Sequence, residues 1–582
     1  MSTVRDFSAE AVKLKDVLFY EEAVYRIPDY QREFSWKKEQ WETFWEELVG
    51  PNAKKGKFAG SILLLNLIDE GSESVEIVDG QQRATMATIY IAAIRDAAEA
   101  AGFANFAKKV QAAEIERFSA DDFEAIGFRL IANPSCRNFM EKRIQSFPSV
   151  NIESKTKEES RIIGAYNFFR ALIDDHMEQL IKEEKQVFLQ ELRGKVRDLR
   201  VIQITVYQDN LKFEIFESVN ARGMALGQSD LIKNYILSRV GRAEIEELNA
   251  DWIDLSNRAE NDGKVNLTDV IRYHWNGNYS FVSKNSLFES YKKRIGSVSE
   301  VKSYVEELDT FLEGLIDISG APQTKLKSKL AGDKQQKESF AQACILLNLL
   351  QVKLHFGLFT TLYVKSAQLP MGFVSRFAKM VSLFTIAHVG ICQLPITRAE
   401  RLFARLSRDI HKSLLKGENA RVKSLNKDFS KAEKDLQDLW PSRELLKDKM
   451  SNVSYTNSTK GLIRALLALV EMRDSHHKEI LVDWPNVNIE HVEPQNPKDK
   501  TRLSQMESKV HLLGNLTLIT ERLNKKLGNK TPNEKAELFT QSMLLITKNL
   551  TSEILDSGWT PDAIDRRTSY LESKLMSILV LS

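Results

Sequence analysis

Residues 60–67 (GSILLLNL), 75–78 (VEIV) and 79–83 (DGQQR) decide the fold of the first third of this chain. The first segment is a short apolar run, the second alternates polar and apolar residues, and the turn-forming segment 70–74 (EGSES) separates them. This pattern predicts a β-hairpin. Apolar residues at helical spacing begin near Arg83 and predict a helix. The first third is therefore predicted to be mixed α/β.

Outside this stretch the pattern is mostly helical. Residues 200–206 (RVIQITV) predict one more strand, and a helix is predicted to start after the cap-like pair Ser229 and Asp230. The spacing over about 100–195 is helical and suggests an insertion. From about 245 to 475 the apolar residues again recur at helical spacing, which predicts a helical middle region.

The last part of the chain predicts a small β-hairpin followed by a helix. Residues 487–492 and 513–519 are the predicted strands, and the helix is expected from Glu521 onward. Such a frame can hold a metal pocket between its two halves.

Composition points to a protein of several domains. The chain has 582 residues, of which 43% are hydrophobic, which is enough for three or four cores. Its 82 basic and 80 acidic residues nearly cancel, so any nucleic-acid surface must be local. Cys136, Cys344 and Cys392 lie too far apart for a zinc knuckle and are expected to be buried and reduced. Without a signal peptide or an 18-residue apolar run, the chain is expected to be cytoplasmic, with no membrane partner.

Residues 490–495 (EHVEPQ), 514–518 (GNLTL) and 523–526 (LNKK) carry the most informative chemistry. They combine an acidic residue next to a histidine with two downstream asparagines. That set is the minimal equipment for hydrolysing a phosphodiester with one divalent metal ion. His491 is the predicted general base, because imidazole titrates near neutral pH.

The neighbours of His491 have predicted supporting roles. Glu490 and Asn524 offer hard oxygen ligands for Mg²⁺ or Mn²⁺. Asn515 is expected to orient the imidazole ring through its second nitrogen. The alternative is that His491 is a buried or capping histidine and that the asparagines are turn residues. The lysines expected to meet backbone phosphates are Lys525, Lys526 and Lys530.

The segment 79–83 lies where the predicted hairpin ends and a helix begins. Backbone N–H groups at a helix start, a permissive glycine and an arginine can cradle a phosphate. The alternative is a tight strand-to-helix turn that merely uses its glycine. The residues of this motif are Asp79, Gly80, Gln81, Gln82 and Arg83.

Two more motifs favour a binding site in this part of the chain. Residues 27–36 (IPDYQREFSW) collect polar, cationic and aromatic groups. Residues 216–226 (FESVNARGMAL) add an Asn-x-Arg-Gly turn before 230–234 (DLIKN). A P-loop of the form Gly-x-x-x-x-Gly-Lys-[Ser/Thr] is absent from the sequence, which argues against an ordinary P-loop NTPase.

A row of cations at helical spacing lies in the predicted middle region. Spacings of 3, 4, 3 and 4 place its members on one helical face, where they could neutralise several DNA phosphates. A solvated face balanced by Glu400 and Asp409 explains the spacing equally well. The row consists of Arg398, Arg401, Arg405, Arg408 and Lys412.

The C-terminal motifs resemble those of the His-Me finger, or HNH, nucleases, and more closely the C-terminal nuclease domain of the GmrSD-type restriction endonucleases, which are type IV, modification-dependent enzymes. The resemblance continues through residues 533–535 (NEK) and through Trp559 with Ile564, Arg566 and Arg567, and it covers most of 440–582. Glu490 stands where HNH enzymes commonly have an aspartate, and the carboxylate is retained.

The N-terminal motifs resemble those of the same family, whose N-terminal core is similar to the ParB and sulfiredoxin fold, over about residues 8–240. The resemblance implies binding and hydrolysis of an NTP with Mg²⁺. It assigns phosphate contacts to Gln82 and Arg83 and a metal or water contact to Asp79. Asn220 and Arg222 would complete the pocket. It also implies that Tyr30, Gln31 and Arg32 form either a pocket wall or a sensor of modified DNA.

Together these patterns predict a multidomain α/β and α protein. Residues 1–240 are expected to form a ParB-like α+β domain, 241–440 a helical linker, and 441–582 a ββα His-Me finger domain within helices. The leading hypothesis is an NTP-regulated, Mg²⁺-dependent endonuclease of anti-phage defence that nicks or cleaves double-stranded DNA carrying sugar, methyl or phosphorothioate modifications. The alternative is a ParB-like nucleotide switch that binds DNA and whose finger is not catalytic.

The patterns leave several partners open. GTP, UTP, CTP and ATP all remain candidate nucleotides, because base contacts are not identified by any motif. Assembly into a homo-oligomer and association with companion defence proteins are likewise compatible with the sequence.

Overall fold

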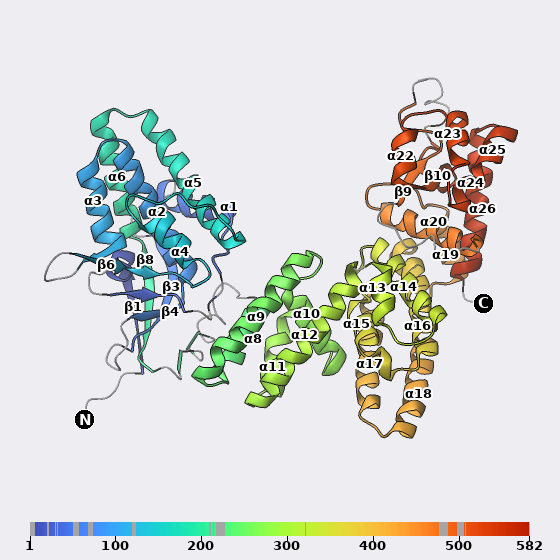
Figure 1. The fold of residues 1–582 in the computed structure, drawn as a ribbon, viewed down its shortest axis with the longest axis horizontal. Coiled ribbons are helices and arrows are strands. Elements are labelled where there is room, and N and C mark those ends of the chain that lie inside the picture. The colour runs from blue at the N-terminus through green and yellow to red at the C-terminus, as the bar shows by residue number, and fades with distance from the viewer. Residues whose placement is uncertain are drawn as a thin grey trace. The chain divides into compact units, whose positions relative to one another are not determined.

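The computed structural model describes residues 6–19, 23–28, 31, 33–50, 57–67, 74–118, 124–208, 211–212, 215–216, 227–320, 322–475, 487–497, 506 and 508–580. The chain divides into two compact units (Figure 1). The N-terminal unit comprises Met1–Trp252 with Arg294–Val301, and the C-terminal unit comprises Ile253–Lys293 with Lys302–Ser582.

A mixed β-sheet forms the frame of the N-terminal unit. Its strands follow the order β1-β8-β3-β4-β2-β7. β3 pairs with β4 antiparallel, which confirms the predicted hairpin, and pairs with β8 parallel. The strands are β1 (Phe7–Lys13), β2 (Tyr25–Arg26), β3 (Phe58–Leu65), β4 (Val75–Asp79), β7 (Leu130–Ile131) and β8 (Arg200–Val206).

The two faces of this sheet bury alternate residues, as the period of two in a strand requires. Ile62 and Leu64 join the main core, whereas Leu63 and Leu65 join a smaller core on the opposite face. Helices cover the first face, and Figure 1 shows α2, α3, α5 and α6 gathered there. The α-helices between residues 38 and 262 are α1 (Lys38–Val49), α2 (Gln81–Ala100), α3 (Ala104–Val110), α4 (Arg137–Phe139), α5 (Lys157–Glu178), α6 (Lys182–Arg197), α8 (Gln228–Ser238) and α9 (Arg242–Asp262).

Two details of the prediction for this unit are wrong. The segment 100–195 is not purely helical, because β5 (Glu116–Phe118) pairs with β6 (Ala125–Phe128), and β7 joins the main sheet beside β2. Strands of two to four residues are too short to produce a recognisable alternation. Helix α8 begins at Gln228 with Gly227 as its N-cap, so the predicted cap residues lie in its first turn.

The middle of the chain is helical, as predicted. One helix in the described residues, Met371–Ile391, is long and apolar enough to cross a membrane, but 67% of its apolar window is buried inside the protein. It packs against α14 and α18 and is therefore a core helix. The helices are α10 (Leu267–Asn278), α11 (Leu287–Arg294), α12 (Val298–Gly320), α13 (Gln323–Lys329), α14 (Lys334–Leu349), α15 (Phe356–Val364), α16 (Met371–Thr385), α17 (Thr397–Leu414), α18 (Glu418–Gln437), α19 (Arg443–Met450) and α20 (Lys460–Asp474).

The last part of the chain contains the predicted hairpin and helix. β9 (Val487–His491) and β10 (Leu516–Thr520) pair antiparallel, and α22 (Glu521–Leu527) follows directly. The second strand begins three residues later than predicted, because Leu513–Asn515 form a 3₁₀ turn. The remaining helices are α23 (Pro532–Phe539), α24 (Leu545–Lys548), α25 (Leu550–Ser557) and α26 (Pro561–Leu579).

The hairpin lies between two hydrophobic cores. Leu516 and Leu518 pack into the core that contains α20, whereas Ile519 packs with Leu523 and Phe539 into a second core. Alternate burial along β10 therefore fixes its register against β9. All three cysteines are buried and free, as predicted.

Candidate active site

His491 ends β9, opposite Leu516 of β10. Its ring packs edge-to-face on Tyr455, with ring centroids 4.8 Å apart, and lies near His511, with centroids 5.6 Å apart. Nε2 lies 3.1 Å from the side-chain nitrogen of Gln495. Burial, reinforced by His511 and Lys535, lowers the pKa of His491 to about 4. The imidazole is therefore neutral at physiological pH, which is the protonation state of a general base.

Glu490 precedes His491 and its carboxylate is 12% exposed. Oε1 forms an ion pair with Nζ of Lys535 at 2.6 Å. Burial raises the pKa of the Glu490 carboxyl group, and the Lys535 cation opposes that rise. One oxygen of the predicted metal ligand is therefore already engaged by a buried lysine of α23.

Asn515 does not take the predicted position beside the imidazole ring. The amide is fully buried, and its oxygen accepts from the Glu493 amide at 2.8 Å and from Trp559 at 3.0 Å. Its nitrogen donates to the carbonyls of Glu493 and Val510. These bonds use both donors and both acceptor positions of the amide. Asn515 therefore holds the turn after His491 rather than the ring itself.

Two arginines to which the sequence motifs give no role support the backbone of the hairpin. Arg567 of α26, which is 6% exposed, donates to the carbonyls of Gly514 and Leu516. Arg464 of α20 donates to the carbonyl of Val487 at 2.5 Å. Arg567 belongs to the C-terminal segment that resembles the restriction family, but the resemblance assigns it no role.

Asn524 is half-buried on α22, which packs against both β9 and β10. The predicted phosphate contacts follow on the surface: Lys525 is exposed and pairs with Glu521, while Lys530 donates to the carbonyl of Lys526. The described residues contain no group of three histidine, cysteine or acidic side chains that could hold a metal.

The oxygen ligands that Glu490 and Asn524 offer are of the kind that Mg²⁺ or Mn²⁺ binds. Mg²⁺ typically binds one or two carboxylates and fills its remaining positions with water and substrate phosphate. One carboxylate from Glu490 and one amide oxygen from Asn524 meet that requirement, whereas a zinc site would need more nitrogen or sulfur ligands.

The N-terminal motif 79–83 spans the end of β4 and the start of α2. Gly80 is the N-cap of α2 with φ +98°, a conformation that favours glycine. Arg83 donates to the carbonyl of Ser61, and a side chain at Gly60 would approach its guanidinium within 2.7 Å. Burial lowers the pKa of Arg83, and nearby Asp79 opposes the shift. Gln81 is buried in the first turn of the helix.

Gln82 joins this motif to the segment 27–36. Its amide oxygen accepts from the backbone N–H of Ser35 at 2.8 Å, and its nitrogen donates to the carbonyl of Glu33 at 3.0 Å. In the reverse direction, Gln31 donates to the carbonyl of Val78 at 2.6 Å. These backbone contacts fix one motif against the other, and the phosphate contact expected of Gln82 stays a prediction.

The third motif lies partly outside the described residues. Asn220 and Arg222 fall there, as do Tyr30 and Arg32 of the first motif. Lys233 of α8 is described and buried, and burial lowers its pKa to about 8 while Asp230 and Glu33 oppose the shift. The segment 230–234 contains Lys233 but gives it no role, and the structure brings it near Glu33 of the first motif.

The cation row on α17 is not an open row of phosphate contacts. Arg405 forms an ion pair with Asp435, and Arg408 donates to the carbonyl of Asn276 at 2.5 Å. Arg401 is exposed and lies over the ring of Phe281 at 5.6 Å. Helical spacing predicted a shared face correctly, but neighbouring helices lie close enough to that face to engage Arg405 and Arg408.

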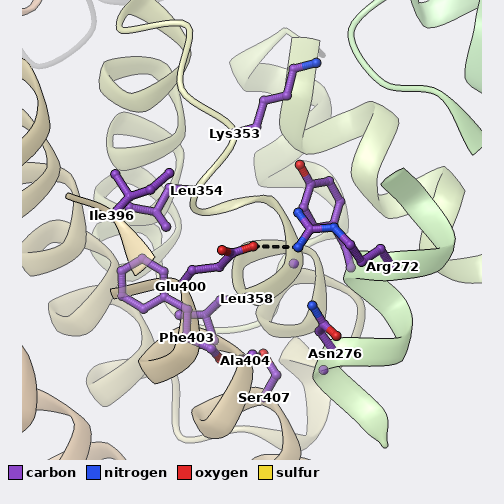
Figure 2. Close-up of a pocket in the computed structure, with 13 residues that line it drawn as sticks. Arg272, Asn276, Lys353, Leu354, Leu358, Ile396, Glu400, Phe403, Ala404 and Ser407 are labelled. Atoms are coloured by element: carbon purple, nitrogen blue, oxygen red, sulfur yellow. Dashed lines mark hydrogen bonds and ion pairs between the residues drawn. The ribbon is translucent and has the colours of Figure 1, made fainter. Parts of the chain in front are cut away.

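Figure 2 shows a cavity of about 130 Å³ among α10, α15 and α17. Arg272 and Glu400 form an ion pair at 2.7 Å beside it. Because this pair neutralises Arg272, Lys353 is the remaining cation of its lining. A polyphosphate site needs more positive charge than that. The cavity is therefore separate from the candidate nucleotide and nuclease chemistry.

Comparison with known families places both motif groups within a single type of enzyme. The family model described as the GmrSD restriction endonuclease N-terminal domain matches residues 14–237, and the model of the GmrSD C-terminal domain matches residues 440–573. A comparison with curated proteins finds no match. Together the two matches cover more than half of the chain, and restriction endonucleases act on DNA in defence against phage. The chain belongs to the GmrSD restriction endonuclease family.

Proposed function

We propose that this protein is a metal-dependent DNA endonuclease whose general base is His491 and whose activity is controlled by a nucleotide bound near residues 79–83. The observation that carries the nuclease assignment is the position of His491 at the end of β9 in a ββα frame, with Glu490 immediately before it in the strand. The family match supports the reaction class.

In the proposed mechanism, His491 accepts a proton from the attacking water. Glu490 and Asn524 would hold the cation, and Lys525, Lys526 and Lys530 would bind the DNA backbone. Bound Mg²⁺ would stabilise the added negative charge of the pentacovalent phosphate. Asn515 keeps the turn at Glu493 rigid through its backbone hydrogen bonds, so the base keeps its place during the reaction.

His491→Ala tests the general base. The variant is expected to lose cleavage of plasmid DNA by at least about 10²–10³-fold, because the proposed acceptor of the water proton is removed. NTP hydrolysis should be nearly unchanged, since that chemistry belongs to the N-terminal unit. His176→Ala, which alters an exposed histidine of α5, is the matched control. A His491→Ala protein that nicks plasmid with Mg²⁺ at the wild-type rate would contradict the assignment.

The nucleotide assignment rests on the α2 N-terminus, where the left-handed Gly80 cap precedes a 20-residue helix, with Arg83 and Asp79 beside it. Helix N-termini favour anions. Phosphate binding would require Arg83 to exchange its bond to the Ser61 carbonyl for one to the nucleotide. Lys233 adds a buried cation near the first motif.

Arg83→Ala tests that assignment. NTP hydrolysis is expected to fall by about tenfold or more, because a charge-assisted contact is lost. Phosphate release measured separately with GTP, UTP, CTP and ATP would also identify the nucleotide. Arg398→Ala, an exposed arginine of α17, serves as the control. Unchanged hydrolysis of every nucleotide by Arg83→Ala would exclude this site.

We further propose that the target is modified phage DNA and that the enzyme works in the cytoplasm. Gln31 links any sensor role of 30–32 to the nucleotide motif, because it donates to the carbonyl of Val78 just before Asp79. Comparing cleavage of sugar-modified, methylated, phosphorothioate and plain DNA would identify the modification. Equal cutting of all four would contradict modification sensing.

A further inference from the structure

Lys535 is a buried cation of the nuclease site to which the motifs give no role. It lies in α23 and is 1% exposed. Its ammonium group pairs with Oε1 of Glu490 at 2.6 Å and donates to the carbonyl oxygen of His491 at 2.6 Å. A buried ammonium ion needs such partners, because burying an unpaired charge is strongly unfavourable. Both partners belong to the two consecutive residues on which the nuclease proposal depends.

The geometry of β9 explains why such a link matters. Successive side chains of a strand point to opposite faces, so the strand alone cannot aim Glu490 and His491 at one phosphate. Lys535 binds the side chain of Glu490 and the backbone carbonyl of His491. Its pairing uses one carboxylate oxygen, and a carboxylate has a second oxygen that can accept another partner.

We propose that Lys535 is a positioning residue that aligns the Glu490 carboxylate with the general base. This inference rests on the proposed nuclease function. At 1% exposure the ammonium group is covered by protein, so its contribution to metal binding and turnover acts through the Glu490 carboxylate rather than through contact with DNA. Removing it should therefore weaken metal binding and turnover while leaving DNA binding largely intact.

Lys535→Met keeps the length of the side chain and removes its charge. Mn²⁺ affinity of the protein without DNA, measured by calorimetry or electron paramagnetic resonance, is expected to fall about 10–100-fold. The kcat for plasmid cleavage should fall by about the same factor. The KM for DNA should change little, because Lys535 does not contact the DNA. Lys548→Met, an exposed lysine of α24, is the matched control and should match the wild type.

Glu490→Gln provides the decisive comparison. If Lys535 acts through Glu490, then adding Lys535→Met to Glu490→Gln causes little further loss of Mn²⁺ affinity or kcat. Losses that multiply would overturn the proposal, and so would wild-type Mn²⁺ affinity and kcat in Lys535→Met alone. Should Lys535→Met fail to fold, the double variant removes both charges together and can still be compared with Glu490→Gln.

The measurement without DNA separates this inference from the nuclease assignment. A wild-type protein that binds Mn²⁺ but cuts no DNA would contradict the proposed function, while the metal affinities of the variants would still test Lys535. Wild-type cleavage with an unaffected Lys535→Met variant would overturn the positioning role alone.

Discussion

Gly514 lies where the backbone of α26 passes over the turn that precedes β10. A side-chain carbon there would overlap the carbonyl oxygen of Ile564 and the hydroxyl group of Thr568. Gly514→Ala is expected to lower the free energy of unfolding by about 1–3 kcal/mol, because the packed backbone has no room for it. Urea denaturation measures the change. Gly194→Ala, in α6 with open space around it, should be neutral or stabilising. A Gly514→Ala variant as stable as the wild type would contradict the claim that α26 leaves no room for a side chain at this position.

At the same scale, the sequence predicts residue chemistry better than residue partners. The pairing of a carboxylate with a histidine at Glu490 and His491 is readable because the two residues are adjacent. The role of Asn515 is not, since its indole partner is Trp559, 44 residues away. The ion pair of Glu490 with Lys535 spans a similar separation. Contacts between residues so far apart in the chain produce no periodic pattern from which the sequence could predict them.

At the scale of elements, local patterns predict β3, β4, β8, β9 and α22, because alternation and turn residues are local signals. β7 escapes such reasoning, since two residues carry no period and the strand exists only through its pairing with β2. The cation row on α17 shows the same limit. Its helical face is predictable, but the neighbouring groups that engage Arg405 and Arg408 are not.

Helix α15 provides an element-scale prediction of acid sensitivity. Its N-cap, His355, is fully buried against Phe356 and Phe359, and among the described residues neither ring nitrogen has a hydrogen-bond partner. Burial lowers the pKa of His355 from 6.5 to about 3. Between those values the unfolded chain binds the proton and the folded chain does not. Stability therefore falls with pH from about 6.5 down to about 3, by up to about 1.4 kcal/mol per pH unit for this histidine.

His355→Leu removes the titrating ring and keeps an apolar side chain in its place. The slope of stability against pH between 6.5 and 3, measured by denaturation at several pH values, should become smaller than in the wild type. His176→Leu alters an exposed histidine and should leave that slope unchanged. An identical slope in the His355→Leu variant would show that His355 is not the source of the acid sensitivity.

At the scale of the whole molecule, the family matches flank a helical region, 238–439, that neither of them covers. The nucleotide motif lies in the N-terminal unit, whereas the nuclease motif lies in the C-terminal unit. The proposed control of cleavage by a nucleotide would therefore require coupling between the units. Within the N-terminal unit, the contacts of Gln82 with the backbone of Glu33 and Ser35 connect the motif 79–83 to the segment that includes 30–32.

The most direct test of this account is cleavage of modified phage DNA by wild type, His491→Ala and Arg83→Ala, each with and without each NTP. We expect the wild-type rate to change with one nucleotide, His491→Ala to hydrolyse that nucleotide without cutting, and Arg83→Ala to lose the response to it. Cleavage by His491→Ala at the wild-type rate, or the same nucleotide response in Arg83→Ala as in wild type, would contradict the account.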